Sequence, residues 1–104
     1  MSIDGISNGD TNLLRMAQQR DAFAQISIAE IRDEVARYNQ WVTSIRDIPG
    51  NAQIADKLIE LSSETLKLLE LQKQPGKRTD ARDQELLALA RAMKSWQAKL
   101  QPAR

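Results

Sequence analysis

Two Pro-Gly dipeptides, Pro49-Gly50 and Pro75-Gly76, constrain this chain more than any other feature, because they divide it into segments of helical length. Proline cannot continue a helix, and glycine readily adopts the left-handed conformation that ends one. The segments between these stops are rich in Ala, Leu, Gln, Glu, Lys and Arg, which favour helix. Because the chain has only two valines and no alternating strand pattern, the sequence predicts an all-α protein.

The stops predict three helices, at about residues 11–47, 52–73 and 80–101. Asn51 is the expected N-cap of the second helix, and Thr79 or Asp80 that of the third. Counting in sevens from Leu14 to Ile45 gives an apolar row typical of a coiled-coil seam. We therefore expect an antiparallel three-helix bundle, with a flexible segment at 1–10 and a single helical domain at 11–104.

The first predicted helix is about 15 residues longer than its partners, or roughly 22 Å at 1.5 Å per residue. Its N-terminal half therefore either extends beyond the bundle or bends at about residue 27. That half carries an apolar stripe that is a candidate partner-binding surface, and Trp41 at the edge of the seam is a candidate anchor. The alternative is that these side chains complete the core of the protein. The stripe consists of Leu13, Met16, Phe23 and Ile26.

The other two predicted helices have wide apolar faces. In the second helix we expect one row of Ile54, Leu58, Leu61 and Leu68, with Ile59, Leu66 and Leu69 beside it. In the third we expect the row to be Leu86, Leu89, Met93, Trp96 and Leu100.

Charge is unevenly distributed, although fifteen basic and fourteen acidic residues nearly cancel over the whole chain. Residues 1–72 have a net charge of −4, and residues 73–104 a net charge of +5. A basic patch around the second Pro-Gly is suited to phosphate or to an acidic protein, or is a solvated turn. The patch consists of Lys73, Lys77, Arg78 and Arg82.

The stretch from Ile54 to Thr65 resembles the IAxxL…SxxT pattern of helix-turn-helix DNA-binding domains. Ile59-Glu60 stand where that pattern has its turn glycine, and the Ser/Thr element lies one residue late. The resemblance implies a DNA-associated regulator that uses residues 54–73. The alternative is one continuous helix.

The chain contains no cysteine and no histidine. It therefore has no disulfide framework, no ligand set for zinc and no His-dependent nucleophile. It also lacks a glycine-rich phosphate loop. We therefore expect no catalytic residues, no metal, no cofactor and no enzymatic activity.

No apolar run is long enough to cross a bilayer, so no membrane association is expected. The first ten residues lack the basic and apolar regions of a Sec signal peptide. A cytoplasmic protein is expected, and export without a Sec signal stays open.

These features favour a non-enzymatic protein–protein interaction module that binds through helical faces. Adaptor, assembly or export chaperone, anti-activator and small subunit of a larger complex all fit. The expected partner is another protein or a second copy, in a dimer or hetero-complex. The alternative is a DNA-associated regulator using residues 54–73 or the basic C-terminal third, which makes nucleic acid the less favoured partner.

Overall fold

The computed structural model describes residues 13–18 and 26–101 and has the predicted all-α architecture, with no strand in these ranges. Three long helices follow one another: α3 (Ile28–Arg46), α4 (Ala52–Lys73) and α5 (Asp80–Gln97). Residues 13–18 are also helical. The predicted flexible segment at 1–10 lies outside the described residues.

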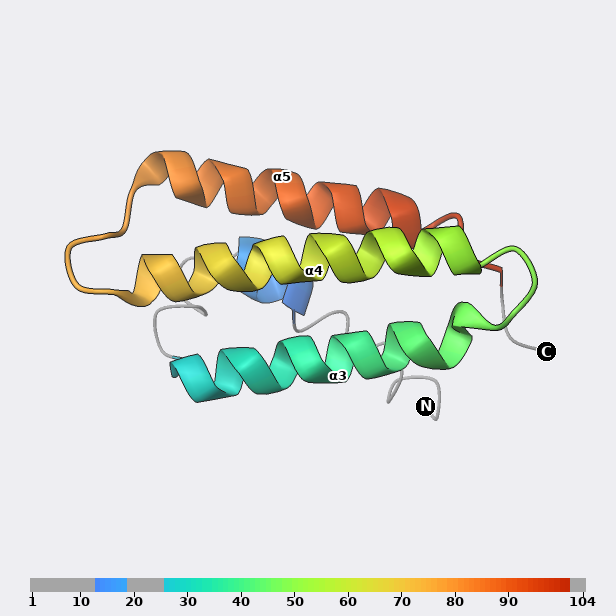
Figure 1. Ribbon diagram of the computed structural model, residues 1–104. Helices are drawn as coiled ribbons and strands as arrows, with labels where there is room; N and C mark the ends of the chain where they lie inside the picture. Colours follow the sequence, from blue (N-terminus) through green and yellow to red (C-terminus); the bar gives the residue numbers. More distant parts are fainter. Residues whose placement is uncertain (1–12, 19–25, 102–104) are drawn as a thin grey trace.

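Helix α4 is the central element, since it packs extensively against both α3 and α5. Figure 1 shows α4 between its two neighbours, with the helical segment 13–18 behind it. The predicted three-helix bundle is therefore completed by a fourth helical piece. That piece contributes Leu13, Leu14, Met16 and Ala17 to the buried core.

The long first helix predicted at 11–47 is interrupted at Ser27, which has extended backbone angles (φ −74°, ψ 161°). Ser27 caps α3: its hydroxyl accepts a hydrogen bond from the Glu30 backbone N–H, and the Glu30 carboxylate accepts one from the Ser27 N–H. This reciprocal capping box satisfies two backbone donors, so it makes a helix start at Ile28 favourable. Of the two predicted alternatives, the change of direction near residue 27 is the one observed.

Both Pro-Gly stops act as predicted, because Gly50 and Gly76 have positive φ angles of 92° and 74°. Helix α4 has the predicted boundaries, and Thr79 caps α5 by accepting a hydrogen bond from the Arg82 N–H. Asn51 occupies the predicted N-cap position of α4, but its side chain makes no capping hydrogen bond.

The buried side chain of Asn51 instead forms hydrogen bonds with the backbone of Gln101, which follows α5. Its carbonyl accepts a hydrogen bond from the Gln101 N–H at 2.7 Å, and its amide donates to the carbonyls of Gln101 and Ile45. Because Asn51 takes both backbone groups of Gln101, the chain leaves the helical path before that residue. Helix α5 therefore ends at Gln97, four residues before its predicted end.

Gln72 makes an equivalent clasp at the other end of the α4–α5 pair. Its side chain accepts from the Thr79 N–H and donates to the Thr79 carbonyl, both at 3.0 Å, and also donates to the Asp83 carboxylate. The two clasps together set α4 and α5 antiparallel and determine their register.

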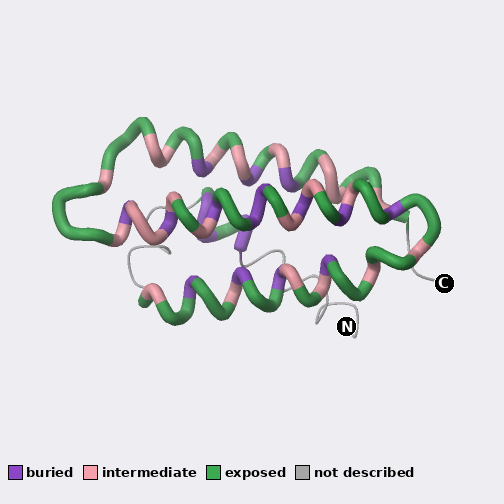
Figure 2. Tube along the Cα trace, in the orientation of Figure 1, coloured by how far each residue is buried: buried purple, intermediate pink, exposed green. Residues whose placement is uncertain are grey.

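The core rows are regular in α3 and α4, where Figure 2 shows buried positions along the inner sides. In α3 the buried residues are Ile31, Val35, Tyr38 and Val42, which lie on the row counted in sevens from Leu14. Ile28 and Ile45, near the two ends of α3 on the same row, are half-buried. In α4 they are Ala55, Leu58, Leu61, Ser62, Thr65, Leu69 and Gln72, and in α5 they are Leu86, Ala90 and Met93.

The predicted faces of α4 and α5 were thus partly wrong. Five residues of the predicted rows are only half-buried: Ile54 and Leu68 on α4, and Leu89, Trp96 and Leu100 on α5. Beside the α4 row, Leu69 is buried, whereas Ile59 and Leu66 are half-buried. The small residues Ala90 on α5 and Ser62 on α4 are buried instead, and the Ser62 hydroxyl donates a hydrogen bond to the Asn39 side chain of α3.

Candidate functional site

The apolar stripe predicted to bind a partner is part of the core where the structure describes it. Leu13 is fully buried and Met16 is 4% exposed, while Ile26 is half-buried against the same core. Phe23 lies outside the described residues. The case for a partner site required these side chains to lie free in solvent, so for Leu13 and Met16 the alternative interpretation, core completion, is correct. Their burial against the bundle is favourable because it removes their apolar surface from water.

Trp41 is half-buried and packs against the core. Its ring lies 5.6 Å from that of Tyr38 at an interplanar angle of 54°. Tyr38 is fully buried, and its hydroxyl donates a hydrogen bond to the Gln97 side chain of α5. Trp41 therefore packs against this tyrosine, and its role as a partner anchor stays a prediction.

The predicted basic patch is partly used within the α4–α5 loop. The Arg78 guanidinium lies 3.6 Å from the Asp83 carboxylate, and Arg82 donates a hydrogen bond to the Lys77 carbonyl. Arg78, Arg82 and Lys73 are half-buried, whereas Lys77 is exposed. The four cations are thus not one free surface, because two of them hold the loop in place.

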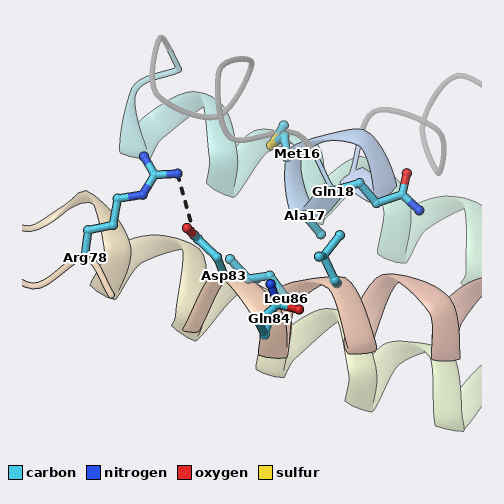
Figure 3. A pocket seen from close by; sticks show the side chains of 8 residues that line it. Met16, Ala17, Gln18, Arg78, Asp83, Gln84 and Leu86 are labelled. Carbon is cyan, nitrogen blue, oxygen red and sulfur yellow. Dashed lines mark ion pairs between the residues drawn. The ribbon is translucent and has the colours of Figure 1, made fainter. Parts of the chain in front are cut away.

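Beside this loop, a cavity of about 190 Å³ separates the helical segment 13–18 from α5. Figure 3 shows Met16 and Ala17 on one side, Asp83 and Leu86 on the other, and the Arg78–Asp83 ion pair at the rim. Gln18 also lines this cavity, and the chain beyond it, at 19–25, lies outside the described residues. This cavity therefore lies where the segment 13–18 meets α5 and the loop before it.

A second hollow, the α4–α5 groove, runs along the contact between these two helices and has a volume of about 490 Å³. Its lining is apolar in the centre and charged at the rim. The central side chains, Leu68 and Leu89, are half-buried, and the remaining lining residues are exposed. The residues that line it are Glu64, Lys67, Leu68, Glu85, Ala88 and Leu89.

The three charged groups of the groove make no hydrogen bond or ion pair with any part of the chain that the structure describes. Two other carboxylates of α4 are paired with arginines of α3: Glu70 with Arg32 at 2.7 Å, and Asp56 with Arg46 at 2.9 Å. These two ion pairs join α3 to α4 and lower the pKa of both carboxyl groups through hydrogen bonds from the arginines. Glu64, Lys67 and Glu85 thus take no part in the ion pairs that join the described helices.

The groove was missed at the sequence level, because Leu68 and Leu89 were assigned to the core. A signal was present: each helix carries more apolar residues than one seam can bury. In α4 six of the seven buried residues, from Ala55 to Gln72, are spaced by alternate steps of three and four; Leu61 lies beside this row and is buried too, whereas Leu68 is not. An apolar arc wider than the buried row leaves side chains at its edge.

The helix-turn-helix interpretation is contradicted by the structure. Residues 54–65 lie within α4, which continues from Ala52 to Lys73 without a turn. Ile59 and Glu60 are ordinary helical residues, whereas the DNA-binding motif needs a turn there to orient a second helix.

The described ranges, residues 13–18 and 26–101, contain neither a candidate metal-binding cluster nor a candidate membrane-spanning helix. No group of three or more acidic side chains there is placed to hold a metal ion. No helix in these ranges combines the length and the apolar character needed to span a membrane.

Comparison of the chain with protein-family models, with curated proteins and with solved structures finds no match.

Proposed function

We propose that this protein is a non-enzymatic interaction module that binds another protein through the α4–α5 groove. One observation carries the proposal: the groove has an apolar floor, Leu68 and Leu89, surrounded by charged groups that have no partner among the described residues. An apolar centre with a polar rim is the usual organisation of a protein–protein contact. Adaptor, chaperone and subunit roles in the cytoplasm are all compatible with such a surface.

The rigidity of the two groove walls supports the proposal. The clasps of Asn51 and Gln72 tie α4 to the chain at both ends of α5. A surface held in one shape loses less conformational entropy when it binds, so more of the contact energy appears as affinity.

The proposal is tested in extracts of the native host by size-exclusion chromatography of the endogenous chain at low and high salt. We expect elution in a larger, nuclease-resistant complex that survives about 0.5 M salt, because apolar contacts tolerate salt whereas phosphate contacts are weakened steeply. Elution at the size of one chain under all conditions would refute the proposal. A nuclease-sensitive, salt-sensitive complex would instead favour nucleic-acid binding.

A further inference from the structure

We infer that the α4–α5 groove binds an amphipathic helix of another protein, with basic side chains flanking its apolar stripe. This inference rests on the proposed function and adds the chemistry of the partner.

Across the α4–α5 groove, the register of the two helices sets a glutamate of one helix level with a leucine of the other, twice. Because the helices are antiparallel and clasped at Gln72–Thr79 and Asn51–Gln101, Glu64 lies level with Leu89, and Leu68 lies level with Glu85. Four residues separate the glutamate from the leucine on each wall, which is about 6 Å along the helix axis. The two carboxylates therefore stand on opposite walls and at opposite ends of the leucine floor.

A helix that lies along the groove fits this pattern. Its apolar residues, repeating every three to four positions, contact Leu68 and Leu89. Residues on either side of that stripe then face the two walls. A basic residue on each flank meets Glu64 on one wall and Glu85 on the other.

Charge distinguishes this occupant from a second copy of the chain. The rim of the groove has two carboxylates and one ammonium group, a net charge of −1. Two copies packed groove to groove would bring four carboxylates against two ammonium groups, and like charges at a contact oppose association. A helix with basic flanks neutralises the excess.

Exposed Ala88 assists this mode of binding. It is the remaining lining residue of the α5 wall, and its side chain is a single methyl group. Because this side chain is small, the backbone of a bound helix can come close to Leu68 and Leu89.

The direct test uses two synthetic helical peptides of about 21 residues, or six turns. Both carry leucines at every third and fourth position. One has lysines flanking the leucines, and the other has glutamates. Fluorescence anisotropy with the full-length chain is expected to show binding of the lysine peptide at least about tenfold tighter than that of the glutamate peptide. Equal binding of both peptides would overturn the inference.

Two double charge-reversal variants test whether the groove determines the preference for the lysine peptide over the glutamate peptide. Glu64→Lys combined with Glu85→Lys should reverse the preference between the two peptides. The matched control is Asp33→Lys combined with Asp47→Lys, which makes the same change in net charge at exposed positions of α3 and its C-cap. The control should keep the preference. If both double variants reverse it, the preference reflects overall charge and the groove is not the site.

A floor variant tests the apolar contact separately. Leu68→Gln with Leu89→Gln should lose binding of the lysine peptide by about tenfold or more. Circular dichroism checks that this variant folds; if it does not, the charge-reversal pair still decides the question. A folded floor variant that binds the lysine peptide as the wild type does would overturn the inference.

Two outcomes separate this inference from the proposed function. In the native host, a complex that persists in the Glu64→Lys, Glu85→Lys variant would leave the interaction function standing and move it to another surface. By sedimentation, a dimer of the purified chain that the same variant dissociates would assign the groove to a second copy. Either result would overturn the basic-helix partner.

Discussion

At the scale of single residues, buried amides define this fold as much as apolar side chains do. Asn51 and Gln72 each satisfy both backbone groups of a residue outside the long helices, Gln101 and Thr79. Both amides are almost completely buried, at 0% and 4% exposure. A buried polar group must be hydrogen-bonded, so each amide admits only the arrangement that supplies its partners.

Asn51→Ala should therefore lower the free energy of unfolding by about 1–3 kcal/mol, because the backbone N–H and carbonyl of Gln101 lose the hydrogen bonds that the Asn51 side chain makes with them. Urea denaturation of the purified protein measures this loss. The control is Gln53→Ala, which removes an exposed amide two residues away and should change stability by less than about 0.5 kcal/mol. Equal effects of the two variants would show that the Asn51 clasp contributes nothing.

At the scale of elements, each helix boundary has an identifiable local cause. The start of α3 is determined by the Ser27–Glu30 capping box, and the start of α5 by Thr79. The stops after α3 and α4 contain glycines with positive φ. The Ser-x-x-Glu signature at Ser27 was visible in the sequence and would have predicted the break that the long apolar row concealed.

Ser27→Ala should cost about 0.5–2 kcal/mol of stability and increase amide hydrogen exchange in the first turn of α3. The matched control is Ser63→Ala, at an exposed position inside α4, where alanine is the better helix former. Stability measured by urea denaturation should fall only for the Ser27 variant. An unchanged first turn in the Ser27 variant would mean that packing alone starts the helix there.

The α3–α4 contact should also give the protein a pH-dependent stability in the acid range. Hydrogen bonds from Arg32 and Arg46 lower the pKa of Glu70 and Asp56 below their ordinary values of 4.5 and 3.8. A carboxyl group whose pKa is lowered by folding stabilises the folded state above its unfolded pKa, and this stabilisation is lost as the pH falls through the folded pKa. Because both ion pairs are exposed, the effect is modest.

The measurement is the free energy of unfolding between neutral pH and about pH 3, a window that contains the ordinary carboxyl pKa values. We expect a smaller acid-induced loss in the Arg32→Gln, Arg46→Gln variant than in the wild type. The same loss in both proteins would contradict a contribution from these pairs.

At the scale of the whole molecule, the helical segment 13–18 completes the core. Leu13 is fully buried, although the nearest long helix begins only at Ile28. In Figure 1 this segment lies behind α4, and its apolar side chains belong to the same core as those of α3, α4 and α5. The α4–α5 groove is at the edge of the α4–α5 contact and has no such cover among the described residues.

Leu13→Ala should therefore destabilise the protein by about 2–5 kcal/mol, as expected for a leucine removed from a core. Leu89→Ala makes the same chemical change at the half-buried groove floor and should cost less, because less apolar surface is lost. Thermal and urea denaturation of the two variants compare them directly. A Leu13 variant as stable as the wild type would mean that the segment does not contribute to the core.

The sequence alone determined the helical class, the two glycine stops, the boundaries of α4 and the buried row of α3, because each depends on backbone conformation or on periodicity within one segment. Tertiary structure decided which edge of α4 and α5 is buried, since both helices have apolar arcs wider than the contact between them. It also decided that Leu13 and Met16 join the core, and that Asn51 clasps Gln101 rather than capping its own helix. Each of these outcomes depends on residues distant in sequence, and neither propensity nor spacing within one helix contains that information.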